Sequence, residues 1–253
     1  MSDKPAPPDP DWIVPEWTAP PGVKALLTTR AGGVSAGPYS SFNLGLSTGD
    51  DPRAVEANRS RLRTLLPAEP RWLKQVHRAH ILDAESVYDR PEADACIART
   101  PGTVCAIQTA DCLPVLFTDR AGSVVAAAHA GWRGLAAGVI DNTVAAMDRA
   151  GVRAREIIAY IGPGIGPGAF EVGDEVREAY VGRDPGAADA FKPHVSGKWL
   201  ADLPSLARRA LERCGVTAVY GGNLCTYSDP QRFYSYRRDK VTGRMAALIW
   251  IEP

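Results

Sequence analysis

Short apolar runs recur along the chain, separated by turns rich in glycine and proline, and they predict a series of buried strands. Small and β-branched apolar residues dominate these runs, as is typical of strands. The predicted strands span residues 23–29, 72–83 (one strand or a pair), 104–108, 115–118, 123–128, 157–161, 216–220 and 244–251.

Helical spacing and capping residues predict four helices between these strands. Asp51 is a good N-cap and Pro52 suits a first turn, so a helix should run from there to about residue 66. Apolar residues three and four positions apart predict a helix over 135–150. Two more helices are expected, one over about 173–180 and one that Asp202 caps and that ends before Gly215.

The order of these elements predicts an α/β (or α+β) fold in which helices cover a mixed sheet. The strands at 123–128 and 157–161 flank a predicted helix, an order that favours parallel strands joined by a crossover. We expect a single domain over residues 11–253, because no Ser/Gly linker divides the chain. Six of the first twenty residues are prolines, so residues 1–10 are expected to form a flexible, extended tail.

Composition and charge argue against several classes of protein. The 29 basic and 29 acidic residues balance and the pI is near 6.9, which disfavours nucleic-acid binding through bulk charge. No apolar run approaches the roughly 18 residues of a membrane helix, and the N-terminus lacks the apolar core of a secretory signal. Five cysteines, an odd number, indicate thiols or ligands and a cytoplasmic location.

The first candidate functional residue is His129, one of only four histidines in the chain. It stands where a predicted strand ends before two glycines and a helix, and such positions face the ligand crevice of α/β proteins. The start of that helix and the adjacent Arg133 could bind an anion such as phosphate. The alternative is a histidine that only satisfies a loop carbonyl.

Cys112 and His77 extend this candidate site. Asp111 beside Cys112 argues against a merely buried thiol, because a buried strand end seldom carries an unpaired carboxylate. Alternation on the predicted strand would place Gln75 and His77 on one face. His77, Cys112 and His129 are zinc-type ligands, and three protein ligands leave a position for water or substrate, as in catalytic sites. The same residues could instead form a metal-free Cys–His hydrolase, and spacing does not separate the two.

Two other segments are expected to line a pocket or an interface. Residues 161–168 alternate glycine and proline after a strand, but the prolines interrupt any match to a nucleotide-binding fingerprint. Residues 232–238 mix basic and aromatic side chains. RNA binding is the alternative for this second segment, and the zero net charge disfavours it.

Taken in order, the motifs resemble the YfiH-like laccase-domain family over about residues 22–252. Single motifs are unspecific, whereas the ordered set is highly specific. The segments that carry the resemblance are Asn43-Leu44-Gly45, Asn58-Arg59, Gln75-Val76-His77, Thr109-Ala110-Asp111-Cys112-Leu113-Pro114, His129-Ala130-Gly131-Trp132-Arg133-Gly134, Ile161-Gly162-Pro163 and Tyr234-Ser235-Tyr236-Arg237-Arg238-Asp239.

The resemblance implies a single α/β domain with a metal site, whose zinc ligands map onto His77, Cys112 and His129. Members of the family are described as purine nucleoside phosphorylases that act on adenosine, inosine and methylthioadenosine and that also deaminate adenosine. An older description is copper-dependent polyphenol oxidase, and one bacterial branch is linked to peptidoglycan editing as an amidase. Many relatives carry cysteines in the glycine–proline loop, where this chain has Gly164, Gly168 and Ala169.

We therefore expect a zinc-dependent purine nucleoside phosphorylase with adenosine deaminase activity, which binds a purine nucleoside and phosphate. Arg133 is the predicted phosphate ligand. The predicted catalytic residues are the three metal ligands together with Asp111, which would carry a proton without binding the metal. Asn43 and Arg59 are weaker substrate-binding candidates. The alternatives are an amidase that uses Cys112 as nucleophile on a peptidoglycan precursor, a copper polyphenol oxidase, and a non-catalytic zinc-binding module.

The oxidase alternative is the weakest of these on the residues alone. Reduction of dioxygen typically uses several coppers held by many histidines. Beyond the two histidines assigned to the metal site, the chain offers only His80 and His194. Copper could still displace zinc at the single site, because copper(II) binds such ligands more tightly.

Overall fold

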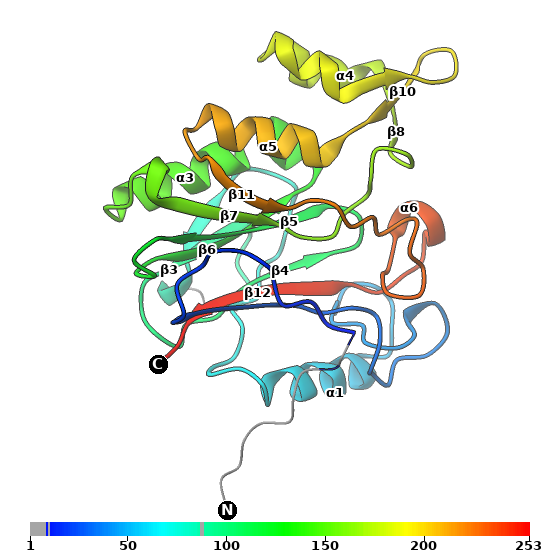
Figure 1. The fold of residues 1–253 in the computed structure, drawn as a ribbon. Helices are drawn as coiled ribbons and strands as arrows, with labels where there is room; N and C mark the ends of the chain where they lie inside the picture. The colour runs from blue at the N-terminus through cyan, green and yellow to red at the C-terminus, as the bar shows by residue number, and fades with distance from the viewer. Residues whose placement is uncertain (1–8, 10, 87–88) are drawn as a thin grey trace, which may run out of the picture.

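Two β-sheets stacked face to face form the centre of the computed structural model (Figure 1). The structure describes residues 9, 11–86 and 89–253, so the predicted tail over 1–10 lies outside the described residues except for Asp9. The larger sheet has the strand order β11 (Ala218–Gly221), β7 (Ile157–Ile161), β5 (Leu113–Asp119), β6 (Val125–Ala130), β3 (Ala95–Ala98) and β2 (Ile81–Asp83). The smaller sheet has the order β1 (Val23–Leu27), β12 (Met245–Ile251) and β4 (Cys105–Thr109).

Helices cover the outer face of each sheet, which gives the order helix, sheet, sheet, helix through the molecule (Figure 1). Helices α3 (Val139–Arg149) and α5 (Leu203–Arg213) lie on the larger sheet, and α1 (Pro52–Arg63) lies under the smaller one. The remaining α-helices are α2 (Trp132–Ala136), α4 (Asp174–Val181) and α6 (Tyr236–Asp239), and a separate sheet contains β8 (Glu171–Gly173), β10 (Lys198–Ala201) and β9 (Phe191–Pro193). Short 3-10 helices lie at Gly37–Tyr39, Ala84–Ser86, Ala154–Glu156 and Pro185–Ala190.

Both faces of strand β12 are buried, each in a different apolar core. Its side chains point alternately to the two faces of its sheet. Ala247 and Ile249 pack in the core between the two sheets. Ala246, Leu248 and Trp250 pack on the opposite face, in the core that also contains Leu62 of α1. The strand is therefore apolar at every position, as the continuous run in its sequence indicates.

The predicted mixed fold is confirmed, and the structure adds the second sheet. β6 and β7 both run antiparallel to β5, which lies between them, so they are parallel to each other as predicted. Among the described residues, no helix has both the length and the apolar character needed to cross a membrane.

All four predicted helical segments are helical, with two differences: one helix ends earlier than predicted, and another is broken at a glycine. Asp51 caps α1 by accepting a hydrogen bond from the backbone N–H of Arg53 at 2.9 Å, but the helix ends at Arg63 rather than near residue 66. The single helix predicted over 135–150 is broken into α2 and α3. Gly138 lies at the break with φ +93°, a conformation that glycine adopts without steric cost.

The predicted strand over 72–83 is wrong apart from Ile81–Asp83. His77 has φ +59°, outside the extended region, so Gln75 and His77 do not share a strand face. The backbone N–H groups of His77 and Arg78 donate to the Asp94 carboxylate at 2.9 and 2.7 Å. A side chain thus takes the donors that a neighbouring strand would otherwise satisfy, and the segment forms a loop.

Candidate active site

The chain crosses from one sheet to the other between β4 and β5, and the crossing places Cys112 at the end of the layer between the sheets. β4 belongs to the smaller sheet and β5 to the larger one, so residues 110–112 span the gap. Asp111 in this turn has φ +91°, which is rare for a residue with a side chain. On β6, His129 shares the face of Ala127 and Val125, both of which pack between the sheets.

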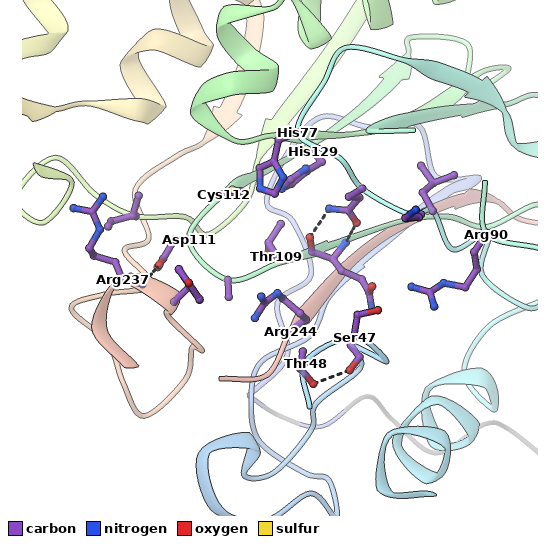
Figure 2. Close-up of a pocket in the computed structure, with 18 of the residues that line it drawn as sticks. Ser47, Thr48, His77, Arg90, Thr109, Asp111, Cys112, His129, Arg237 and Arg244 are labelled. Carbon is purple, nitrogen blue, oxygen red and sulfur yellow. Dashed lines mark hydrogen bonds between the residues drawn. The ribbon is translucent and has the colours of Figure 1, made fainter. Parts of the chain in front are cut away.

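His77, Cys112 and His129 come together as the sequence predicts (Figure 2). Their possible ligand atoms all lie within 4.8 Å of one another, and the two imidazole rings are edge-to-face with centroids 4.7 Å apart. No other group of three metal-ligand side chains forms in the part of the chain that the structure describes. His80 and His194 lie elsewhere, against the Glu92 carbonyl and the Glu171 carboxylate respectively.

Asp94, which is not among the residues predicted from the sequence, holds both histidines in place. Its fully buried carboxylate lies 2.8 Å from His129 Nδ1 and also accepts the backbone N–H of His77. With Nδ1 engaged, His129 presents Nε2 to the site, which is the arrangement that fixes the tautomer of metal-binding histidines. A single aspartate in the run Ala93-Asp94-Ala95 is the only sequence signal, because an apolar strand start seldom carries an unpaired carboxylate.

Gln75 attaches the His77 loop to the smaller sheet. Its side-chain amide donates to the backbone carbonyl of Gln108 at 2.8 Å and accepts the backbone N–H of the same residue at 2.8 Å. Gln108 belongs to β4, whereas Asp94 and His129 belong to or flank strands of the larger sheet. The loop that carries His77 is therefore fixed from both sheets.

The charges at the site favour a thiolate on Cys112. Burial raises the pKa of this thiol, but the positive charge and hydrogen bond of His129, together with a hydrogen bond from His77, outweigh burial and lower it to about 6. Burial acts to lower the pKa of His129, yet the Cys112 thiolate and Asp94 raise it to about 9. In the metal-free protein the pair is thus thiolate and imidazolium at neutral pH, and a thiolate is the form that binds zinc.

A cavity of about 620 Å³ opens beside the three ligand residues (Figure 2). This volume is within the range of pockets that bind small molecules. Residues from both sheets and from the C-terminal segment contribute to it, and four of its side chains are lysine or arginine. The lining residues are Gly45, Ser47, Thr48, Leu73, Lys74, Gln75, His77, Arg90, Gln108, Thr109, Ala110, Asp111, Cys112, His129, Ile165, Phe170, Tyr236, Arg237 and Arg244.

Asp111 lies on the pocket wall, and each of its carboxylate oxygens already has a hydrogen-bond partner. One oxygen accepts from the Thr226 hydroxyl at 2.7 Å, and the other accepts from the backbone N–H of Arg237 at 2.6 Å. Arg133 lies outside the lining residues, where its exposed guanidinium stacks on the Trp132 ring at 4.2 Å. The structure therefore brings Asp111, but not Arg133, to the candidate site.

Asn43 and Arg59 also lie outside the lining residues, and their polar groups hold the segment that carries Ser47 and Thr48. Asn43 accepts the backbone N–H of Gly45 at 2.9 Å and donates to the Thr48 hydroxyl at 2.9 Å. Arg59 donates two hydrogen bonds to a single backbone carbonyl, that of Leu44, at 3.0 and 2.8 Å. Both residues therefore shape the pocket wall from behind.

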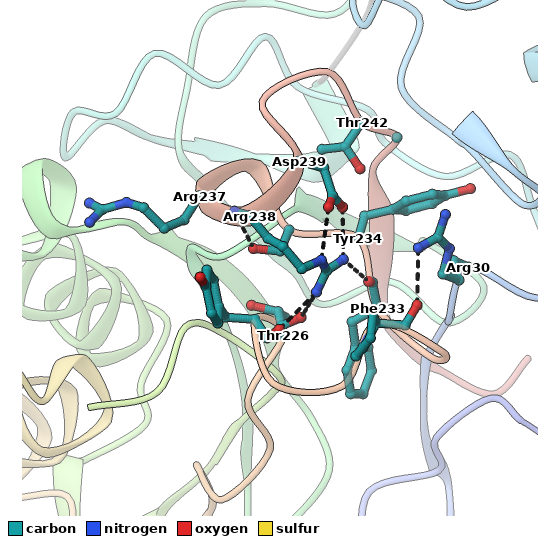
Figure 3. Close-up of polar contacts among 12 residues, drawn as sticks. Arg30, Thr226, Phe233, Tyr234, Arg237, Arg238, Asp239 and Thr242 are labelled. Atoms are coloured by element: carbon teal, nitrogen blue, oxygen red, sulfur yellow. Dashed lines mark hydrogen bonds and ion pairs between the residues drawn. The ribbon is translucent and has the colours of Figure 1, made fainter. Parts of the chain in front are cut away.

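The basic and aromatic segment near the C-terminus lines the pocket, as predicted. Tyr236 and Arg237 are among the lining residues. Arg238 holds the segment by donating to the backbone carbonyls of Thr226 and Phe233 at 2.8 and 2.9 Å, and it pairs with the Asp239 carboxylate at 2.8 Å (Figure 3). This arginine faces the protein's own backbone, so it fixes the pocket wall.

The two-sheet fold and the His–Cys–His site at the end of the interface define an α/β protein with a candidate metal centre. The chain belongs to the family described as multi-copper polyphenol oxidoreductase laccase, which it matches over residues 24–252. The cluster of three ligand residues and the family together indicate metal binding.

Similar proteins have been named for an enzymatic activity. The chain is 53% identical over 242 residues to "Purine nucleoside phosphorylase YfiH" of Escherichia coli, covering 94% of this chain and 98% of that one. It is 52% identical to "Purine nucleoside phosphorylase PA4543" of Pseudomonas aeruginosa, covering 95% and 98%. Among solved structures, Neisseria meningitidis protein NMB0706 superposes with a TM-score of 0.92 at 51% identity, covering 96% of this chain and all of that chain.

The role of Asp94 predicts the effect of removing its charge. Asp94→Asn should weaken metal binding by about 10- to 100-fold, because the amide no longer orients and polarises the His129 ring as a carboxylate does. Competition with a chromophoric chelator measures the affinity, and Asp148→Asn on the exposed face of α3 is the matched control. Parent-like metal affinity in a folded Asp94→Asn protein would contradict this role.

The low pKa of the Cys112 thiol predicts unusual reactivity in the metal-free protein. Because the thiolate forms above pH about 6, alkylation of Cys112 by iodoacetamide should rise through pH 6 and level off near pH 7. His129→Gln should shift this rise to higher pH, because it removes the positive charge that lowers the pKa. Peptide mapping by mass spectrometry measures the rate at each pH. A rise that begins only above pH 8 in the parent protein would disprove the thiolate–imidazolium pair.

Proposed function

We propose that this protein is a metal-dependent purine nucleoside phosphorylase. The observation that carries the proposal is a set of three ligand residues whose open side faces a 620 Å³ pocket rich in cationic side chains. The names of relatives that are about half identical over nearly their whole length support the same activity. The pocket volume suits a nucleoside together with an anion. A small-molecule substrate pair is therefore favoured over a non-catalytic zinc module.

The ligand set favours zinc as the resident metal. One thiolate and two imidazoles are typical zinc ligands, and three protein ligands leave the fourth position open, as in catalytic zinc sites. The possible ligand atoms of His77, Cys112 and His129 lie within 4.8 Å of one another, and Asp94 engages His129 Nδ1, which leaves Nε2 as the ligand atom. When bound there, zinc supplies positive charge for Lewis-acid chemistry next to the pocket. Copper(II) is the alternative, since it binds such ligands more tightly.

Phosphorolysis sets clear demands on the remaining residues. A phosphate oxygen forms a bond to C1′ of the ribose while the bond from C1′ to N9 of the purine breaks, giving the free base and ribose 1-phosphate. Phosphate must be held on the side of the ribose opposite the base, and the exposed Tyr236 ring and the Phe170 ring offer apolar surface for the purine. The cationic lining would bind phosphate and screen its charge during attack.

Deamination of adenosine is a second activity proposed for the same pocket. It would replace the 6-amino group with oxygen from water and release ammonia. Asp111 is the proposed proton carrier on the pocket wall. Its two oxygens each accept one hydrogen bond, from the Thr226 hydroxyl and from the backbone N–H of Arg237, and each keeps a second lone pair that can take a proton. We also propose a cytoplasmic location, which the odd number of cysteines supports.

A Cys–His hydrolase is the second candidate function, and one observation favours it. A ring nitrogen of His129 lies within 4.8 Å of Cys112 Sγ, and His129 Nδ1 lies 2.8 Å from Asp94, so the three residues are arranged as nucleophile, base and orienting carboxylate. Such a site could cleave an amide in a peptidoglycan precursor. A thiolate bound to zinc is not free to attack, so metal content separates the two functions.

The decisive experiment compares products from metal-analysed protein. With adenosine and phosphate, we expect adenine and ribose 1-phosphate in equal amounts, and with adenosine alone only slow conversion to inosine. The purified protein should contain about one zinc per chain, and Cys112→Ser and His129→Ala should lose both zinc and turnover, whereas Cys214→Ser should keep both. Mass spectrometry identifies the products.

Two outcomes would reject the phosphorylase proposal. The first is turnover that does not depend on phosphate. The second is amide hydrolysis of a muramyl peptide precursor that increases when a chelator removes zinc and that iodoacetamide abolishes. This second outcome would establish the Cys–His hydrolase.

The single group of three ligands also predicts feeble phenol oxidation. The described residues assemble one such group, whereas dioxygen reduction by multicopper oxidases uses several coppers. The copper-loaded protein should therefore oxidise a phenolic substrate much more slowly than the zinc-loaded protein converts adenosine. An oxygen electrode and product analysis compare the two rates. Phenol oxidation that matches nucleoside turnover, with dioxygen consumed in proportion, would overturn this expectation.

A further inference from the structure

The pocket contains more positive charge than its neighbours neutralise. Its cationic side chains are Lys74, Arg90, Arg237 and Arg244. Lys74 pairs with Glu92 at 2.8 Å. Within the described part of the chain, none of the three arginines has a carboxylate within 4.0 Å. Three guanidinium groups without ion pairs in one cavity indicate that its ligand carries negative charge.

Arg244 is the arginine whose donors are best placed for such a ligand. Its Nη1 donates to the backbone carbonyls of Thr242 and Gly243 at 3.1 and 2.9 Å, which fixes the plane of the guanidinium. In the described structure, Nε and Nη2 donate to no protein atom, and the side chain lines the pocket. Figure 2 shows it reaching from the start of β12 into the space between the ligand residues and the Ser47–Thr48 loop.

Residues 43–45 pack against Arg244 and hold its backbone in place. Asn43 Oδ1 accepts the backbone N–H of Arg244 at 2.8 Å, and the backbone N–H of Leu44 donates to the Arg244 carbonyl at 3.1 Å. A Cβ atom on Gly45 would lie 2.8 Å from Arg244 Cγ, so glycine is needed there for the arginine to fit. Asn43 also orients Thr48, another lining residue. The segment that holds Arg244 therefore also shapes the wall beside it.

The positive charge of the Arg244 guanidinium is not fully balanced by the charges around it. Burial lowers the pKa of Arg244, and the more distant negative charges of Cys112 and Asp111 only partly offset this effect. Cys112 is committed to the metal site, and both Asp111 oxygens accept other hydrogen bonds. A guanidinium stays protonated at neutral pH, so an anion in the pocket is the partner that would satisfy it.

We propose that Arg244, positioned by Asn43, is the residue that binds a phosphate oxyanion in this pocket, with Arg237, whose Nη1 donates to the Glu171 carbonyl at 2.7 Å, as a second guanidinium that lines it. The proposal rests on the proposed phosphorolysis for its choice of inorganic phosphate as the ligand. The same chemistry would also bind the phosphoryl group of a nucleoside 5′-monophosphate. Arg133, which the sequence favours for this role, lies outside the lining residues.

The test compares Arg244→Gln with Arg133→Gln and with Arg149→Gln, which removes an exposed arginine from α3. Arg244→Gln should raise the KM for phosphate by about 10- to 100-fold, because hydrogen bonds between charged groups are lost. Its zinc content and its KM for adenosine should stay within about twofold of the parent, a split that general misfolding would not produce. Arg244→Lys should restore part of the phosphate affinity, and Asn43→Ala should raise the KM for phosphate by a smaller factor.

Direct binding separates this proposal from the phosphorylase assignment. Titration of the zinc-loaded protein with inorganic phosphate, followed by phosphorus NMR, requires no turnover. If Arg244→Gln loses phosphate binding and the control variants keep it, the subsite is supported. This holds even if the parent protein fails to cleave adenosine, a result that would reject only the proposed function. Inhibition by adenosine 5′-monophosphate that Arg244→Gln relieves would show that a nucleotide phosphoryl group also binds there.

Two results would overturn the proposal. One is parent-like phosphate affinity in a folded Arg244→Gln protein. The other is an increase in the KM for phosphate in Arg133→Gln that Arg244→Gln does not show, which would return the role to the arginine at the start of α2.

Discussion

The buried carboxylate of Asp94 is the constraint on which the candidate site depends. A carboxylate with no exposed surface must find hydrogen-bond donors, and Asp94 finds them in the His129 ring and in the backbone of the His77 loop. Satisfying this one charge therefore bends residues 76–78 into a loop and fixes the face that His129 presents. The pKa of Asp94 is lowered, because these hydrogen bonds outweigh the effect of burial, so the group stays charged and the arrangement persists at neutral pH.

Buried polar side chains also fix the part of the pocket wall that residues 43–48 form. Polar side chains from three parts of the chain form hydrogen bonds with backbone groups of a single segment, residues 43–48. Asn43, Arg59 and Gln108 all bond to this segment, and Leu44 alone accepts hydrogen bonds from two of them. Asn43 and Arg59 thus act as a scaffold behind the pocket wall, whereas Gln108 both holds this segment and lines the cavity.

The sequence predicts the structure best where a residue's chemistry allows only one role, as for an apolar run that must be buried or for a scarce ligand-type side chain. The uniformly apolar run at 157–161 is observed as β7, and the scarce His and Cys side chains identify His77, Cys112 and His129. Prediction fails where a long-range polar contact decides the conformation, as for the loop at His77. Asp94 and Arg244 were missed because their importance comes from partners 17 and 201 residues away in the chain. Local sequence patterns do not predict contacts between residues that are so far apart in the chain.

The position of the site between two sheets gives a bound metal ion a mechanical role. His129 stands on the larger sheet, Cys112 lies on the segment that crosses between the sheets, and Gln75 ties the loop of His77 to the smaller sheet. A metal held by all three residues therefore links the two layers as a cross-link would. By linkage, the free energy of metal binding then adds to the cohesion of the sandwich, and any separation of the sheets at this end lowers metal affinity by the same amount.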